Sequence, residues 1–178
     1  IYNYTMMKKV LSLFPLFLIL FSGFAQENAQ WMRYPAISPD GEKIVFSCKG
    51  DLYIVPSQGG EARLLTFHEA YDYQPVWSPN GKYIAFSSIR YGNSDVFIIP
   101  AEGGEAKRLT SFSSAEKPSA FSPDGKRILY YSLIQDDPDN VQFPTRAFGE
   151  LYSVSVDGGR PERVLTTPAL GATYDNDE

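Results

Sequence analysis

One short segment has the residue types of a metal site or a catalytic triad. His68-Glu69-Ala70-Tyr71-Asp72 begins like the zinc-protease motif His-Glu-x-x-His, but Asp72 replaces the second histidine. A catalytic zinc site needs about three protein ligands. His68 is the only histidine of the chain, so a Ser-His-acid triad could use no other, and no serine lies in a Gly-x-Ser-x-Gly elbow. We therefore expect no catalytic residue, metal or cofactor in this chain.

A second candidate for a cation site is the acidic cluster Asp136-Asp137-Pro138-Asp139-Asn140. Carboxylates gathered in this way are typical calcium ligands. The cluster lacks the glycine and the distal glutamate of the twelve-residue calcium loop. We therefore interpret it as a solvated acidic loop.

Binding is the remaining chemistry, and a few charged and aromatic residues suit it. Arginine can hold a carboxylate through two hydrogen bonds, and tyrosine offers an amphipathic contact surface. On loop position alone, the candidate binding residues are His68, Glu69, Tyr71, Asp72, Arg90, Tyr91 and Arg146. The alternative that any one of them belongs to a solvated connection stays open. If they bind a substrate, replacing Arg90 and Arg146 by alanine in the full-length protein should alter its turnover while leaving the melting temperature nearly unchanged.

A repeated sequence motif must position these residues. "PAISPDGEKIVFSC" at 35, "PVWSPNGKYIAFSS" at 75 and "SAFSPDGKRILYYS" at 119 align on Gly41, Gly81 and Gly125, which are 40 and 44 residues apart. Such periods are typical of propeller blades of four strands. Each copy predicts a short strand, a Ser-Pro-Asp/Asn-Gly turn, a second strand, a third strand that begins at an acid, a Gly-Gly turn and a fourth strand that finishes in Leu-Thr.

The connections of variable length indicate where binding residues lie. The first-to-second and third-to-fourth connections keep their lengths in all three copies, whereas the second-to-third connection grows. In an up-and-down blade, alternate connections lie on opposite faces, so the long loops share one face with the links between blades. Variable loops on a rigid scaffold tend to carry function. The candidate segments are residues 67–74, 88–94, 111–117 and 133–149.

The hydrophobic pattern predicts an all-β fold, a partial β-propeller of four-stranded antiparallel blades. The second and third strands are apolar on both faces, which requires a neighbour on each side, and the charged fourth strands suit an outer edge. We expect blades at about 31–66, 71–110 and 117–166, with the start of the next at 167–178. Expressed alone, residues 26–178 should aggregate or dimerise, because an incomplete ring exposes an apolar blade face.

The first 25 residues have the pattern of a secretory signal peptide. We expect residues 1–5 to precede the true start, at Met6 or Met7. Lys8-Lys9, a short apolar run and Gly23-x-Ala25 form the three expected regions. The run from Val10 to Phe21 is shorter than the roughly 20 residues that span a bilayer, although a retained anchor is the rival interpretation. We expect a periplasmic or secreted protein that does not bind the membrane after cleavage. A net charge of −5 without a basic patch argues against nucleic acid as a partner.

The unit from "PVWSPNGKYIAFSS" to "DVFIIPAEGGEAKRLT" resembles the TolB-type propeller repeat over residues 35–166. The chain more narrowly resembles the amino-terminal propeller of exported bacterial tricorn protease homologues. This likeness rests on two stretches, "FHEAYDYQPVWSPNGKYIAFSSIRYGNSDVF" and "QFPTRAFGELYSVSVDGGRPERVLTTPA". In that family the catalytic serine and histidine lie in a carboxy-terminal peptidase region that follows a PDZ domain, and no matching position exists here.

The resemblance implies peptides or proteins as partners, together with further blades and PDZ and peptidase domains of a longer chain. The chain would scaffold or gate the access of peptides to that distant site, with the residues named above binding the substrate. Two alternatives stay open: a non-enzymatic TolB-like propeller that docks proteins, and a propeller fused to another hydrolase, of the amidohydrolase or prolyl-oligopeptidase type.

Overall fold

The structure, a computed structural model, describes residues 31–132, 149–165, 169 and 171–174. The expected signal peptide, the acidic cluster at 136–140 and Arg146 lie outside these residues, as does most of the expected start of a fourth blade. No helix that could cross a bilayer occurs in the part of the chain that is described.

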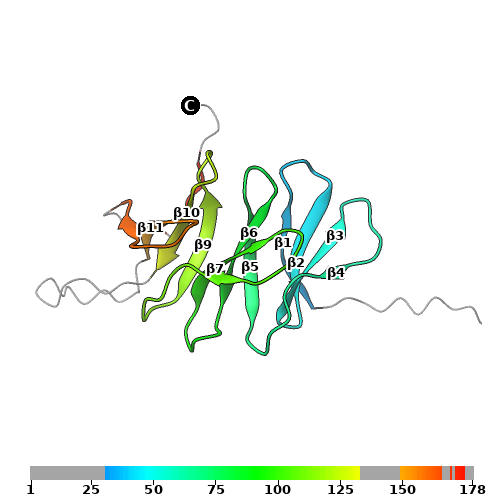
Figure 1. The fold of residues 1–178 in the computed structure, drawn as a ribbon, viewed down its shortest axis with the longest axis horizontal. Helices are drawn as coiled ribbons and strands as arrows, with labels where there is room; N and C mark the ends of the chain where they lie inside the picture. Colours follow the sequence, from blue (N-terminus) through cyan, green and yellow to red (C-terminus); the bar gives the residue numbers. More distant parts are fainter. Residues whose placement is uncertain (1–30, 133–148, 166–168, 170, 175–178) are drawn as a thin grey trace, which may run out of the picture. The chain divides into compact units, whose positions relative to one another are not determined.

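Within the described residues, twelve strands form three four-stranded antiparallel sheets, each with its strands in sequence order. Blade 1 contains β1 (Met32–Ile37), β2 (Lys43–Cys48), β3 (Asp51–Pro56) and β4 (Arg63–Leu64). Blade 2 contains β5 (Asp72–Trp77), β6 (Tyr83–Ser88), β7 (Asp95–Pro100) and β8 (Lys107–Arg108). Blade 3 contains β9 (Glu116–Phe121), β10 (Arg127–Ser132), β11 (Glu150–Ser155) and β12 (Glu162–Arg163). Figure 1 shows the three sheets in sequence order, so the all-β partial propeller is confirmed.

The Ser-Pro-Asp/Asn-Gly turn is held by its own side chains. In blade 2, the Ser78 hydroxyl donates to Asn80 Oδ1 over 2.8 Å and accepts from the Tyr83 amide over 2.9 Å. Gly81 has a φ of 67°, a left-handed conformation that glycine adopts without steric cost. The equivalent hydrogen bond, from the serine hydroxyl to an aspartate, recurs in blades 1 and 3. The motif therefore repeats because it fixes the first hairpin of every blade.

The Leu-Thr pair lies just beyond the fourth strand, which is shorter than the sequence predicts. The β3–β4 ladder covers only Arg63 and Leu64. Leu65 is buried, and the Thr66 hydroxyl accepts from the Leu52 amide over 2.9 Å. Thr110 does the same for Val96 in blade 2. The threonine thus satisfies a backbone donor that a longer fourth strand would have paired.

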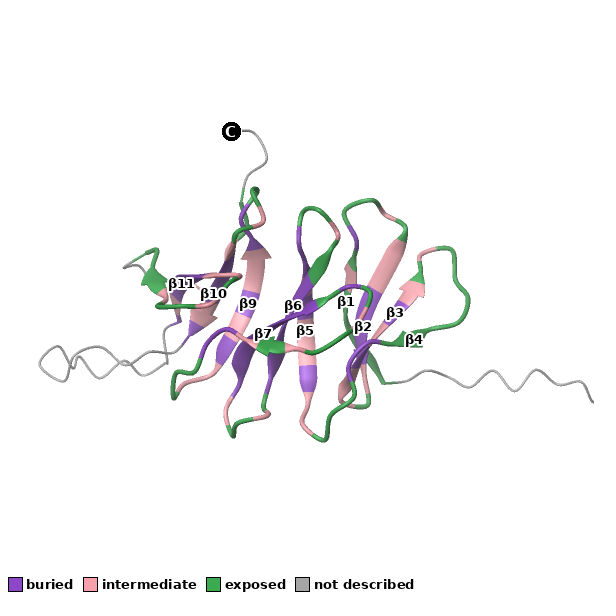
Figure 2. Cartoon of the chain, viewed as in Figure 1, coloured by how far each residue is buried: buried purple, intermediate pink, exposed green. Residues whose placement is uncertain are grey.

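Each interface between blades contains a hydrophobic core. Residues such as Leu52, Trp77 and Phe97 form the core between blades 1 and 2, and a second core, which includes Phe121 and Val154, lies between blades 2 and 3. In blade 2, β6 and β7 are buried along nearly their whole length, whereas burial alternates along β3 of blade 1 (Figure 2). The double-sided apolar pattern is therefore most complete in blade 2, which has a neighbour on both sides.

Candidate functional site

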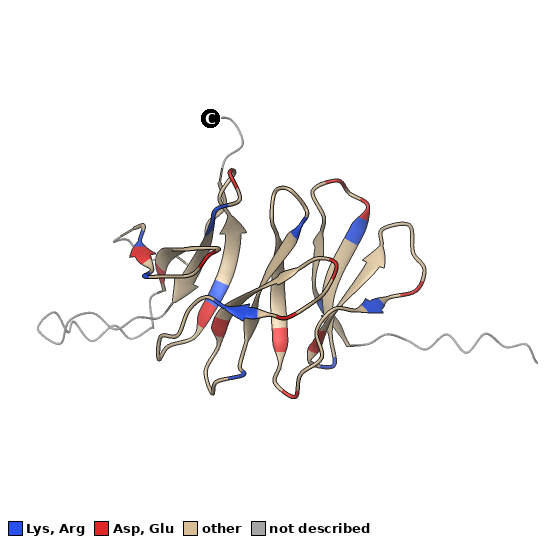
Figure 3. Cartoon of the chain, viewed as in Figure 1, with Lys and Arg blue, Asp and Glu red and all other residues tan. Residues whose placement is uncertain are grey.

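The second-to-third connections and the links between blades meet on one face, which we call the link face. The Asp72 amide, at the start of β5, donates to Gly50 O over 2.7 Å, and the Glu116 amide, at the start of β9, donates to Ser94 O over the same distance. Asn93 Nδ2 also donates to Phe112 O over 2.6 Å. The predicted gathering of variable loops on one face is therefore confirmed for residues 67–74, 88–94 and 111–117, whereas the loop at 133–148 lies outside the described residues. Acidic residues stand at the link-face ends of β5 and β9 (Figure 3).

His68, Glu69 and Tyr71 lie in the first link. His68 and Glu69 are exposed, and the His68 ring accepts a hydrogen bond at Nδ1 from the Ala70 amide over 2.9 Å. Tyr71 is half-buried and contacts Tyr73, with ring centroids 5.3 Å apart. Among the described residues, no three His, Cys, Asp or Glu side chains are grouped to hold a metal ion.

Arg90 and Asp72, two of the candidate binding residues, contact each other. Arg90 Nη2 lies 2.8 Å from Asp72 Oδ2, and only 14% of the Arg90 side chain and none of the Asp72 side chain is exposed. The guanidinium also lies 5.8 Å from the Phe86 ring centroid and 5.1 Å from that of Phe97. We call this arrangement of a buried carboxylate and two stacked rings the Asp72 socket. Arg90 fills it, so its guanidinium is already engaged within the fold.

Tyr91 covers the same region from the outside. Its ring stacks on Phe97, with centroids 6.2 Å apart, and Arg108 lies 4.3 Å from the Tyr91 ring centroid. Arg108 Nη2 also pairs with the buried Asp95 carboxylate over 2.8 Å. Tyr91 itself stays largely exposed. Of the predicted binding residues that are described, Tyr91, His68 and Glu69 are the exposed ones.

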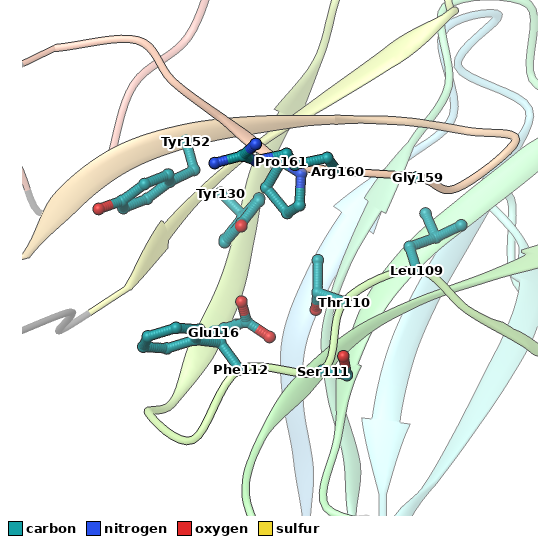
Figure 4. Close-up of a pocket in the computed structure, with 10 residues that line it drawn as sticks. All are labelled: Leu109, Thr110, Ser111, Phe112, Glu116, Tyr130, Tyr152, Gly159, Arg160 and Pro161. Carbon is teal, nitrogen blue, oxygen red and sulfur yellow. The ribbon is translucent and has the colours of Figure 1, made fainter.

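A pocket of about 300 Å³ lies at the interface between blades 2 and 3. Its lining includes Thr110, Phe112, Glu116, Tyr130, Tyr152 and Arg160 (Figure 4). Glu116 is fully buried, and neither of its carboxyl oxygens makes a hydrogen bond of good geometry within the described structure. We call this space the Glu116 pocket.

The environment of the Glu116 carboxyl favours its neutral form. Burial raises the pKa of Glu116 to about 7, and the nearby Asp95 carboxylate adds to this effect. The Thr110 and Tyr130 hydroxyls and the Phe112 amide lie close enough to oppose it in part. Burial also raises the pKa of Asp95, against the influence of Arg108. A cation that entered the pocket would relieve this unfavourable burial of charge.

The sequence indicated the segment of this pocket but not the pocket itself. Residues 111–117 form a candidate link, but the sequence does not distinguish Glu116 within it. The sequence predicts Tyr130 and Tyr152 only as strand residues. The repeat carries one signal that could have found Glu116, since it stands at the place of Asp72. That no described cation pairs with Glu116, however, becomes visible only in the folded structure.

Comparisons with known proteins agree with this fold. Residues 29–178 match the family model described as "Tricorn protease N-terminal beta propeller domain". Among curated proteins, none matches the chain in sequence.

Three solved structures illustrate the likeness. A TolB-type protein from Agrobacterium tumefaciens is 24% identical with a TM-score of 0.62, over 75% of this chain and 49% of that one. The tricorn protease is 17% identical with a TM-score of 0.56, over 81% and 16%. The acylaminoacyl peptidase of Pyrococcus horikoshii is 13% identical with a TM-score of 0.58, over 79% and 25%. At these identities the likeness shows the fold alone, and the chain spans about half or less of each structure.

Proposed function

This chain belongs to the family of tricorn protease N-terminal β-propeller domains, and we propose that it is the propeller part of an exported serine peptidase. In this role it scaffolds or gates the access of peptides to a catalytic domain elsewhere in the same protein. The observation that carries the proposal is the family match over residues 29–178. The further blades, PDZ and peptidase domains expected from the resemblance would be its intramolecular partners.

The composition of the link face supports a role in guiding rather than in catalysis. His68 is exposed in a link, and its Nδ1 is engaged by the Ala70 amide. A nucleophile-base pair requires hydrogen-bond contact between the two side chains, and no described serine makes one with His68. Exposed His68, Glu69 and Tyr91 instead offer charge and aromatic surface to a passing peptide.

Export is part of the proposal and is supported by the first 25 residues, which have the basic, apolar and small-residue regions of a cleaved signal. The mature protein would then act in the periplasm or outside the cell. Amino-terminal sequencing of the protein recovered from these compartments tests this step. A mature chain that begins near Gln26 is expected, whereas retention of Lys8 and Lys9 would contradict cleavage.

The peptidase role is tested on the intact protein with a fluorophosphonate probe, which labels activated serines, and we expect labelling.

Guidance by the link face is tested with peptides of increasing length. We expect replacement of both His68 and Glu69 by alanine to change kcat/KM for long peptides more than for a small ester. The matched control replaces Glu42 and Lys82, which are exposed on the opposite turns. Equal effects of the two double variants would contradict guidance by the link face.

A second candidate function is a non-enzymatic, TolB-like propeller that docks proteins. The observation in its favour is the fold shared with the TolB-type structure over 75% of this chain. The same probe separates the two, because a TolB-like protein would carry no reactive serine and would leave the fluorophosphonate unreacted.

A further inference from the structure

The two interfaces between blades contain the same socket at equivalent positions of the repeat. Asp72 and Glu116 each begin the first strand of a blade. Phe86 and Phe97 stack with centroids 5.8 Å apart and an interplanar angle of 29°. Tyr130 and Tyr152, at the corresponding places, stack at 5.7 Å and 25°. A buried carboxylate beside a pair of stacked rings is therefore built twice.

The two sockets differ in what fills them. In the Asp72 socket, the Arg90 guanidinium binds the carboxylate and lies across both rings. In the Glu116 pocket, the described residues place no cation on the carboxyl group, and the space of about 300 Å³ remains. Arg160 is among the residues that line this pocket (Figure 4). It is an exposed residue.

We propose that the Glu116 pocket is a binding site for a guanidinium group, the charged end of an arginine side chain. The comparison of the Asp72 socket with the Glu116 pocket supports this proposal, which does not depend on the peptidase role. A guanidinium is planar, donates two parallel hydrogen bonds to a carboxylate and stacks on aromatic faces, whereas an ammonium does only part of this. The pocket has the volume of a small-molecule site.

Two sources could supply this group. One is an arginine of a bound peptide or protein. The other is an arginine of this chain, and Arg146, which lies outside the described residues, stands four positions before Glu150, much as Arg90 stands five before Asp95. Both sources present the same chemistry, and an Arg146→Ala variant distinguishes them.

The test is a calorimetric titration of the intact protein at pH 8 with N-acetyl-arginine amide. N-acetyl-citrulline amide has nearly the same shape without the charge, and N-acetyl-lysine amide has the charge without the plane. We expect the arginine derivative to bind at least about tenfold more tightly than either, the scale of one charge-assisted hydrogen bond. Glu116→Gln should remove this preference, and Glu61→Gln, an exposed acid of blade 1, should not.

The outcomes are distinct. Binding to the unmodified protein supports the proposal with a peptide or protein as the source. Binding that emerges only in Arg146→Ala supports it with the chain's own arginine as the source. The proposal is overturned if the arginine derivative binds neither protein, if citrulline binds as well, or if Glu116→Gln binds equally.

The pH dependence provides a second measurement that needs no Glu116 variant. Because the pKa of the free Glu116 carboxyl is about 7, the carboxylate that holds the cation is mostly present at pH 8 and mostly protonated at pH 5.5. Affinity should therefore rise about thirtyfold between these values, in proportion to the ionised fraction of the carboxyl. The other ionisable and charged groups near this carboxyl are Asp95 of β7 with its partner Arg108, Tyr130 of β10, Tyr152 of β11 and Arg160. An affinity independent of pH would overturn the role of Glu116.

Discussion

Arg90 donates to the buried Asp72 carboxylate over 2.8 Å and lies across Phe86 and Phe97, with 14% of its side chain exposed. A loop arginine with no partner could be replaced without a cost in stability, as expected from the sequence. The observed contacts change that expectation for Arg90. Its removal would leave a carboxylate buried without a counter-charge, which is more costly than the loss of an exposed contact.

We therefore predict that Arg90→Ala destabilises blade 2 by about 3 kcal/mol. Hydrogen exchange of the intact protein measures this through the protection of amides in β5 to β7. In an Asp72→Asn background the same replacement should cost much less, since no buried charge remains. Equal losses in the two backgrounds would mean that the ion pair does not carry the effect.

The first hairpin of each blade is stabilised by a buried serine. Ser78 is buried, and its hydroxyl is the acceptor for the Tyr83 amide. We predict that Ser78→Ala lowers the stability of the β5–β6 hairpin by about 1–2 kcal/mol, because a buried N–H loses its acceptor. Exchange of the Tyr83 amide in the intact protein checks this. Ser113→Ala, at an exposed link position, is the control and should change little.

The strands were largely predictable from the sequence because they depend on local chemistry. Turn glycines and apolar runs place β2 and β6, and an acid marks the first residue of β3, β7 and β11. The ends of the fourth strands were less predictable. Thr66 accepts a backbone hydrogen bond beyond the ladder, and this contact joins residues 14 positions apart.

The candidate site was predictable only as a region. The unequal loop lengths locate the link face, but they do not distinguish an arginine that binds a ligand from one that fills a socket. That distinction depends on side chains from different strands of the folded blade, as Arg90, which follows β6, shows beside Asp72 of β5. Glu116 is defined in the same way, by neighbours from β10 and β11 that are far away in sequence.

The leucine after each fourth strand is buried where another blade packs against it. Leu65 and Leu109 are 7% and 6% exposed, because the next blade covers each of them. Leu165, at the same place in blade 3, is 45% exposed. On blade 1, Trp31, Met32 and Ile37 are also exposed. Large exposed apolar surfaces mark association sites, and these side chains are the candidates for such a site on each outer blade.

We predict that residues 26–178, expressed alone, form dimers or aggregates, as measured by size-exclusion chromatography with light scattering. Leu165→Asp should shift the distribution towards monomer, because a charge at a blade interface opposes apolar association. Phe67→Asp is the matched control: Phe67 is exposed too, but it lies in a link rather than after the last strand. A soluble monomer with a cooperative thermal transition would show that three blades bury enough surface to be stable without neighbours, and association unchanged by Leu165→Asp would place the contact elsewhere.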